Sequence, residues 1–531
     1  MAKGLIALGV IVFLAAAYYI VQSTVEKKVR QAIATPLTGI NTGYDSRIGN
    51  VKVNLLRRSV MLKDVRITSM PSDTLSGEGF EVNFKKLMLE GVKLGKTNDK
   101  RSVKARKLRL HSPHVVLNTV KKQAEGKGTQ QAESNAINKL KAALASVSVS
   151  VSRIEIEDGY FTYNVTDGDD VATYSLEDLD MNAAGFLADS VMTPKIFMCD
   201  EISFTADRFS YLFHDRMISV EADDIVVDTR EGIFSVAASR VSPQIAQAEF
   251  AVKDPRHADW TKLESGGIKG WGIDYAGISA QGKVIMDSLS INTVNVHSYK
   301  NRKVYQKERI KNLFFQSVRD FPVKFDLGKV ALADINVIYE EMPVEGAKSG
   351  TITFDRINGT FDRLTNIVTS PDQHMTLTAG CLLMNRTPLN AVFVMPLAHD
   401  NNRFHVSGRL SAIDATALNV VVEPLAKTRI ESGNVSSMLF DIRGGLHTAE
   451  VSMTLLYKDL KIAALKEENG VVHKRRFQSW LADNIFLKTN NEAGEFAKSV
   501  TATNERNPHR SQFNYLWKSI YAGVEKTIKG L

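Results

Sequence analysis

Apolar and polar residues alternate along most of the chain. A period of two predicts β-strands that bury one face, rather than helices. The interruptions between the alternating stretches, such as Asp64 and Ser112-Pro113, are typical of turns or bulges. In the first part of the chain the alternating stretches are Val51-Val53-Leu55, Val60-Leu62, Val65-Ile67, Val82-Phe84, Leu108-Leu110 and Val115-Leu117.

A faint internal repeat accompanies the short alternating strands predicted between residues 147 and 340. Ser150–Asn164 aligns with Asp326–Glu340, and Asp158 and Asp334 take matching positions between two alternating stretches. Repeated units that each bury only part of a face must extend a common sheet. The matching apolar residues are Ile154, Ile156, Phe161 and Tyr163 in the first segment, and Val330, Leu332, Val337 and Tyr339 in the second.

Several stretches depart from this rhythm. Residues 254–276, rich in Gly and Trp, predict a loop, and residues 305–319 predict a helix. Nearer the C-terminus the pattern predicts three antiparallel strands, with turns at Gly444-Gly445 and Lys458-Asp459. These strands are Val435–Ile442, Thr448–Tyr457 and Leu460–Leu465.

The last part of the chain predicts amphipathic helices. Val471–Leu487 and Ser511–Lys529 are the candidates, with a polar loop at Glu492–Arg510 between them. The final helix could lie on a membrane surface, or pack on the sheet or on a partner protein, and the sequence leaves both open. Its apolar stripe includes Phe513, Leu516, Trp517 and Ile520, whereas Lys518 lies on another side.

The N-terminus is the most apolar part of the chain. Gly4–Val21 contains 18 residues without a charge, and as a helix it would rise about 27 Å, close to a bilayer core of about 30 Å. Lys3 and Ala15-Ala16-Ala17 also fit a cleaved signal peptide. Because the apolar run continues to Val21, we predict an uncleaved transmembrane anchor, whose orientation the flanking charges leave open.

Composition and charge narrow the function. The 531 residues are 44% apolar, and the net charge is +8, from 67 Lys+Arg and 59 Asp+Glu. Residues 1–122 alone hold 22 Lys+Arg and 8 Asp+Glu, whereas the remainder is mildly acidic. This asymmetry argues against general nucleic-acid binding and for a basic zone near an anionic surface. Two cysteines, Cys199 and Cys381, exclude a disulfide scaffold.

No catalytic or metal-binding constellation stands out. Leu94–Thr97 resembles the end of a P-loop, but Glu90 stands where that motif needs glycine. His111 and His114 lack companion ligands, and the acidic residues between Asp223 and Asp228 suit turns. We therefore predict that the protein is not an enzyme and has no cofactor or metal.

The remaining signal is architectural. The predicted fold is mainly β. An N-terminal transmembrane helix is followed by an extended, curved, antiparallel-rich β-sheet groove, with a few peripheral amphipathic helices. An apolar face of this kind could shield the acyl chains of phospholipids, because each buried CH₂ contributes about 0.8 kcal/mol. The eight matching apolar residues of the repeat are the candidate lipid-binding residues. A structural or assembly factor for outer-membrane proteins is the alternative.

The chain resembles the AsmA family of bacterial envelope proteins, which includes TamB-type proteins. The resemblance rests on Val51–Ile67, on Arg153–Asn164 and Lys329–Glu340, and on Phe404–Pro424 with the strands that follow it. It implies a single-pass inner-membrane anchor with the bulk of the chain in the periplasm. It further implies a groove related to bridge-like lipid-transfer proteins and a role in outer-membrane lipid homeostasis, with another envelope protein as a candidate partner. The family has no catalytic residues to carry over.

These predictions divide the chain into six parts: residues 1–25 as the anchor, 26–122 as a basic β region, 123–146 as a polar linker with a short helix, 147–366 as central groove repeats, 367–465 as an AsmA-like β region and 466–531 as C-terminal amphipathic helices.

Overall fold

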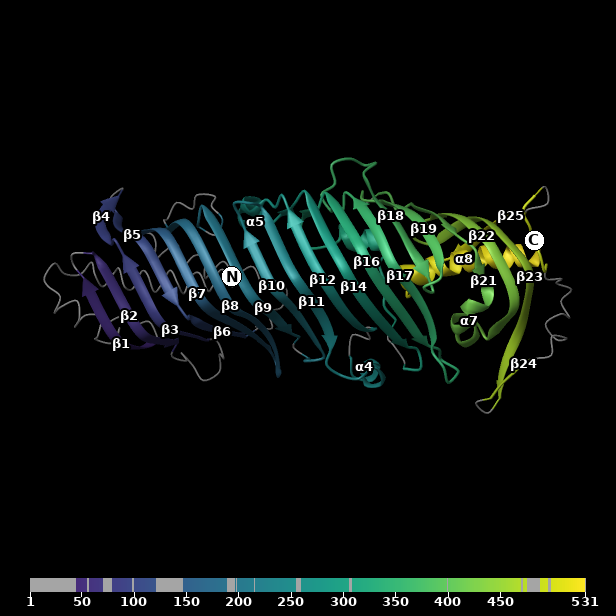
Figure 1. Cartoon of the computed structure of the whole chain (residues 1–531), viewed down its shortest axis with the longest axis horizontal. Helices are drawn as coiled ribbons and strands as arrows, with labels where there is room; N and C mark the ends of the chain where they lie inside the picture. The colour runs from purple at the N-terminus through teal and green to yellow at the C-terminus, as the bar shows by residue number, and fades with distance from the viewer. Residues whose placement is uncertain are drawn as a thin grey trace. The chain divides into compact units, whose positions relative to one another are not determined.

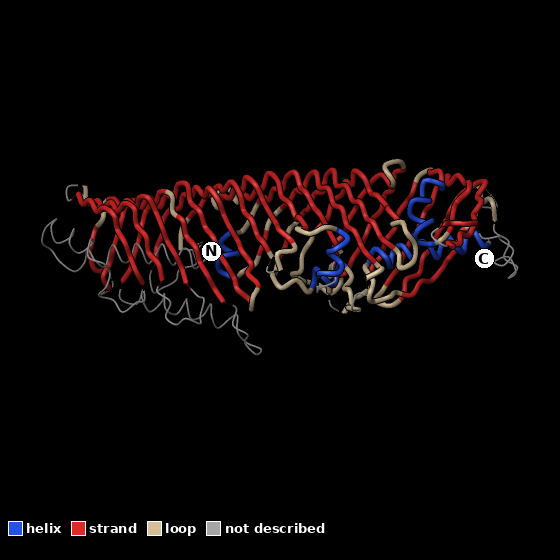
Figure 2. Tube along the Cα trace, turned by 90° about the horizontal axis from the view of Figure 1, so that it is seen from below, coloured by secondary structure: helices blue, strands red, loops and turns tan. Residues whose placement is uncertain are grey.

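The computed structural model describes residues 44–530, except for residues 55–56, 70–78, 98–99, 121–146, 189–195, 197, 214, 255–258, 305–307, 399, 469–470, 475–487 and 495–497. The predicted anchor at Gly4–Val21 and the predicted linker helix lie outside this part. Among the described residues, no helix is both long and apolar enough to cross a membrane. Strands dominate the described part, and its helices are few and mostly short (Figures 1 and 2).

The described chain divides into two compact units. Unit 1 contains residues up to Arg240 together with Gly272–Gly282, and unit 2 contains Val241–Trp271 and the residues from Lys283 onward. The strand β11 (Ile233–Pro243) spans the division along the chain. Each unit is described separately below.

The described residues of unit 1 form a mixed, largely antiparallel sheet with one short helix. Neighbouring strands pair antiparallel from β1 through β3 and from β7 through β10, whereas β5 and β6 both pair parallel with β7. Its elements are β1 (Tyr44–Asn54), β2 (Ser59–Ser69), β3 (Gly79–Glu90), β4 (Lys93–Thr97), β5 (Lys100–His111), β6 (His114–Val120), β7 (Val147–Asp167), β8 (Asp170–Ala188), β9 (Glu201–Leu212), β10 (Ile218–Asp228) and α5 (Tyr275–Gln281).

A residue with left-handed backbone interrupts four of these strands, β2, β7, β8 and β10, and another one separates β5 from β6. In β7, Asp158 has φ 57°, and the pairing with β8 shifts at this point. Ile156 and Phe161 are five positions apart, so a regular strand would turn them to opposite faces. The bulge adds one residue and keeps both on the same face. The other interruptions in unit 1 lie at Asp64, Ser112, Asp178 and Asp224.

Unit 2 is also mixed and largely antiparallel. Its β14 and β16 pair parallel along their whole length, and its other main strands pair antiparallel from β16 through β23 and on to β25. Its strands are β12 (Trp260–Trp271), β13 (Val284–Ile285), β14 (Ser288–Asn301), β15 (Phe325–Asp326), β16 (Lys329–Met342), β17 (Gly350–Asp362), β18 (His374–Leu383), β19 (Thr387–Pro396), β20 (Phe404–Leu410), β21 (Ile413–Asp414), β22 (Thr428–Gly444), β23 (Thr448–Glu468), β24 (Val471–Lys474) and β25 (Ser499–Glu505). The helices among its described residues are α4 (Gln247–Lys253), α6 (Phe314–Arg319), α7 (Asn419–Ala426) and α8 (Gln512–Lys529), with a 3₁₀ turn η1 at Ala415–Leu418.

The repeat predicted from the sequence has the same local geometry in both units. Asp334 in β16 has φ 54°, like Asp158 in β7. Thr293 in β14 has φ 52° and lies between two residues that pair with the neighbours of Asp334. The interruption by Asp is therefore a bulge inside one long strand, as the sequence allowed, and not a turn between two strands.

Four predictions about individual elements are wrong, because hydrogen bonds to distant strands decide them. Residues 260–271 of the predicted loop form β12, which pairs with β14 along its length. The predicted turn at Lys458-Asp459 is a bulge within β23, with Asp459 at φ 55°. The predicted helix from Val471 begins instead as β24, and the predicted polar loop contains β25.

The predicted helix at residues 305–319 is shorter than expected. Only α6, from Phe314, is helical, and residues 308–313 are not. Their backbone groups bond outside a helix: Lys311 N–H donates to the carbonyl of Pro508 at 2.8 Å. The side chain of Gln512 accepts from Phe314 N–H at 2.6 Å. Hydrogen bonds to residues distant in the sequence therefore take the place of those expected within the first turns of the predicted helix.

Candidate functional site

One face of the unit 1 sheet is apolar, and we call it the inner face of unit 1. Alternate residues of β2, β3, β5 and β7 contribute side chains that are almost fully buried there, including Leu87, Leu108 and Val151 at 0, 0 and 1% exposure. The opposite side of these strands is the outer face of unit 1. Because these side chains are almost completely buried, the part of the inner face formed by β2, β3, β5 and β7 is the core of unit 1.

The inner face of unit 1 is less covered toward β8, β9 and β10. Phe161 pairs with Val115 of β6 and Leu176 of β8, and all three side chains are half-buried. In the next strand, β9, Phe209 pairs in turn with Leu176 of β8. These strands thus present a strip of apolar side chains that the described residues cover only in part.

A row of aromatic residues borders this strip. Tyr163, Tyr174 and Tyr211 occupy directly paired positions in β7, β8 and β9. The rings of Tyr163 and Tyr174 stack at 5.8 Å, and those of Tyr174 and Tyr211 at 4.3 Å. Tyrosine combines a large apolar body with a polar tip, so such a row suits a boundary between apolar and polar surroundings.

Unit 2 has a corresponding inner face, defined by the buried apolar cluster around Leu313, Phe404 and Met453. Toward β14 and β16 this face is again half-buried, at Leu332 and Val337. Tyr339 in β16 holds the position that matches Tyr163. Its hydroxyl donates to Glu341 Oε2 at 2.7 Å, and burial together with the Glu341 charge raises the pKa of Tyr339.

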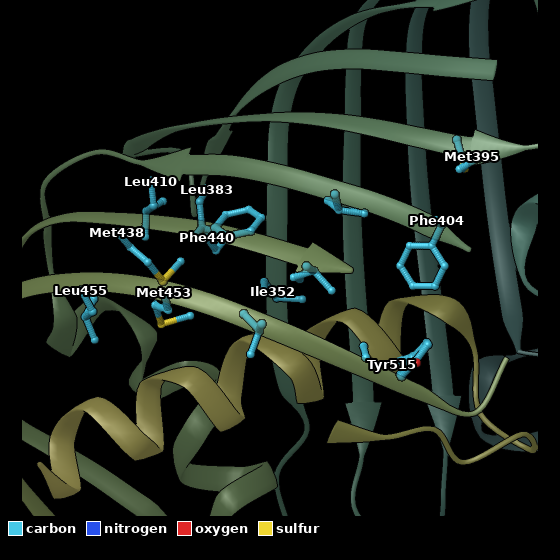
Figure 3. Close-up of a cluster of buried hydrophobic side chains, with 14 of the residues drawn as sticks. Ile352, Leu383, Met395, Phe404, Leu410, Met438, Phe440, Met453, Leu455 and Tyr515 are labelled. Carbon is cyan, nitrogen blue, oxygen red and sulfur yellow. The ribbon is translucent and has the colours of Figure 1, made fainter. Parts of the chain in front are cut away.

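Helix α8 packs along the inner face of unit 2, over β23 and β25 (Figure 3). Its most buried residues recur every four positions and are mostly small: Tyr515, Ser519, Gly523 and Thr527. A Cβ on Gly523 would stand 2.9 Å from Met453 Cε, so glycine permits this close approach. The ring of Tyr515 meets that of Phe404 edge-on at 5.9 Å.

The apolar stripe predicted for this helix flanks that contact. Leu516, Trp517 and Ile520 are partly buried against the cluster, and the ring of Phe513 lies 5.6 Å from Tyr339 and 5.9 Å from Phe354. Lys518 is exposed, with its ammonium 5.6 Å from the ring centre of Tyr521. Of the two roles left open for this helix, packing on the sheet is the one the structure shows.

The eight predicted lipid-binding residues all lie on inner faces, four in each unit. Ile154 and Val330 are buried at 2% exposure each and belong to the cores. The other six are half-buried and belong to the partly covered strips: Ile156, Phe161, Tyr163, Leu332, Val337 and Tyr339.

Sequence reasoning missed part of this surface. Tyr174, Leu176, Phe209 and Tyr211 lie in the same rows as the predicted residues. The signal was present as alternation in both segments, Tyr174-Leu176 and Phe209-Tyr211, but each segment is short. Only the register of β8 and β9 brings these residues beside Phe161 and Tyr163.

The outer face of unit 1 carries the basic charge seen in the sequence. Lys63, Lys86 and His111 stand opposite one another in β2, β3 and β5. Nearby, Lys107 and Arg109 bind Glu155 at 2.6 and 3.1 Å. Burial alone would raise the pKa of Glu155, but these hydrogen bonds lower it.

The outer face of unit 2 contains an open hollow of about 750 Å³. Its lining is mixed, with polar residues beside Val392 and Leu439. One of its acids, Asp441, is bound by His405 Nε2 at 2.5 Å and by Arg443 Nε at 3.3 Å. Two of its lining residues, Phe440 and Met453, also belong to the apolar cluster.

Reactive chemistry is sparse in the described part of the chain. No group of three or more His, Cys, Asp or Glu residues there is placed to hold a metal ion. Asp223, an acid singled out in the sequence, binds Arg208 at 2.9 Å and Arg240 at 2.8 Å. Cys199 and Cys381 are not joined, and burial raises the pKa of the Cys381 thiol to about 11.

Comparisons with protein-family models and with curated protein sequences find no match to this chain.

Proposed function

We propose that this protein binds and transfers phospholipids, with their acyl chains lying along the half-buried strips of the two inner faces. One observation carries the proposal: in each unit, the apolar face that forms the core continues as a partly covered strip that ends at tyrosines, Tyr163 and Tyr339. Apolar surface left in water costs roughly 25 cal/mol per Å², so a bound acyl chain would stabilise it.

The proposed location follows the family resemblance and the apolar N-terminal segment. In this proposal Gly4–Val21 anchors the chain in a bacterial inner membrane and the remainder extends into the periplasm. The basic outer face around Lys63 and Lys86 would then face anionic headgroups at the membrane surface. Lipid transfer toward the outer membrane needs no catalytic group, in keeping with the proposed non-enzymatic role.

Site-specific crosslinking of the full-length chain tests the proposal. A photoreactive amino acid is placed at Tyr163, on the inner face, or at its outward neighbour Thr162, and cells are irradiated before purification. Phospholipid attached to position 163 and absent from position 162 is the expected result. A lipid-free protein at both positions would mean that the strips only complete the core, and would favour the assembly-factor alternative.

A further inference from the structure

The inner face of unit 2 changes from apolar to charged along β14 and β16. In β14 the inward residues run from Leu289 and Ile291 to Ser298 and Lys300. Ser298 pairs with Tyr339, and Lys300 pairs with Glu341. The strip that we propose for acyl chains therefore ends at a row of ionisable side chains.

Two lysines meet at this end. Lys300 is only 7% exposed, and its ammonium binds Asp259 Oδ1 at 3.2 Å. Lys311 enters from the segment before α6, where its backbone N–H donates to Pro508. Burial and the neighbouring positive charge of Lys300 lower the pKa of Lys311, whereas the nearby carboxylate of Asp259 raises it. Arg510 adds a third positive charge nearby.

The acids at this point do not balance these cations. Asp259 is bound by Lys300, and Glu341 is bound by Arg302 at 2.9 Å and by the Tyr339 hydroxyl. Within the described residues, no carboxylate forms an ion pair with Lys311 or Arg510, and Asp259, the acid near Lys311, is already bound by Lys300. Cations brought together away from water repel each other unless an anion joins them.

We propose that Lys300, Lys311 and Arg510 form a binding site for a phosphate group. Ammonium and guanidinium groups make strong, charge-assisted hydrogen bonds to phosphate oxygens. The site rests on the proposed function in one respect: a phospholipid headgroup would sit here while its chains lie over Leu332 and Val337. Free inorganic phosphate would satisfy the same side chains.

The test uses the full-length chain in a non-ionic detergent and two variants. Lys311→Met keeps most of the apolar stem and removes the charge. Lys329→Met is the matched control, because Lys329 is an exposed residue on the outer side of β16. Arg510→Met replaces the first variant if Lys311→Met unfolds, as judged by circular dichroism.

The first measurement is phospholipid retained per chain after incubation with vesicles of phosphatidylglycerol and phosphatidylethanolamine. We expect Lys311→Met to retain at least fivefold less lipid than the parent and the control. Equal retention in all three proteins would overturn the headgroup site and leave the proposed function standing.

The second measurement is the shift of the melting temperature of lipid-free protein on titration with inorganic phosphate. A shift in the parent that Lys311→Met loses, with no lipid retained by any protein, would support a free-phosphate site and overturn the proposed function. If the parent protein shows neither lipid retention nor a phosphate-dependent shift, both the phosphate site and the proposed function are overturned.

Discussion

Replacing Phe161 by Asp tests whether the half-buried strip of unit 1 is a binding surface. Phe161 lies between Val115 and Leu176 on the inner face. Because the side chain is half-buried, an aspartate there can keep its carboxylate in water. The loss of stability should be about 1 kcal/mol, roughly half of what full burial of a phenylalanine contributes.

The effect on lipid binding should be larger. An acyl chain crossing β7 would bring about three CH₂ groups over this position, at about 0.8 kcal/mol each. Losing them weakens binding by about 2.4 kcal/mol, or about 50-fold. The matched control is Thr162→Asp, which adds the same charge to the outer face of the same strand.

The assay measures phospholipid per mole of full-length chain by extraction and mass spectrometry, beside urea unfolding of each protein. We expect Phe161→Asp to lose most of its lipid while Thr162→Asp retains it. Equal lipid content in the two variants, with both proteins folded, would refute the assignment of this strip to acyl chains.

Three further predictions concern the fold. Asp334→Val should destabilise the protein by at least about 1 kcal/mol relative to Asp334→Gly, because a β-branched residue fits the left-handed backbone poorly; urea midpoints of the two variants check this. Asp223→Asn should cost about 1 kcal/mol at neutral pH. Arg208 lowers the pKa of Asp223 in the folded protein. The stabilisation by Asp223 is therefore fully present above the pKa of an unperturbed aspartate and is lost as the pH falls through the folded-state pKa. Unfolding curves of parent and variant should differ at pH 7 and converge in acid. Gly408→Ala should cost about 1–3 kcal/mol in thermal unfolding, because its Cβ would stand 2.2 Å from Phe440 Cζ; an unchanged melting temperature would contradict this packing.

Local pattern was enough to predict the strands and the faces of the repeat. Alternation placed Ile156 and Phe161 among the apolar residues of the repeat, and the aspartate between them was compatible with a turn or a bulge. Both inferences depend only on neighbours in the chain, because side-chain direction in a strand has a period of two. The final helix was also predictable, since its N-cap residue Ser511 and its amphipathic pattern are local.

The tertiary structure decided what distant hydrogen bonds and close packing control. Val471–Lys474 is a strand because the end of β23 offers it a pairing partner, and a helical pattern could not reveal that partner. The small residues of α8 face the sheet because Gly523 lets the helix approach Met453, although the sequence pointed to its large apolar stripe. Lys300 and Lys311 likewise become neighbours only because the segment before α6 packs beside the end of β14. Periodicity along a single strand does not encode this packing.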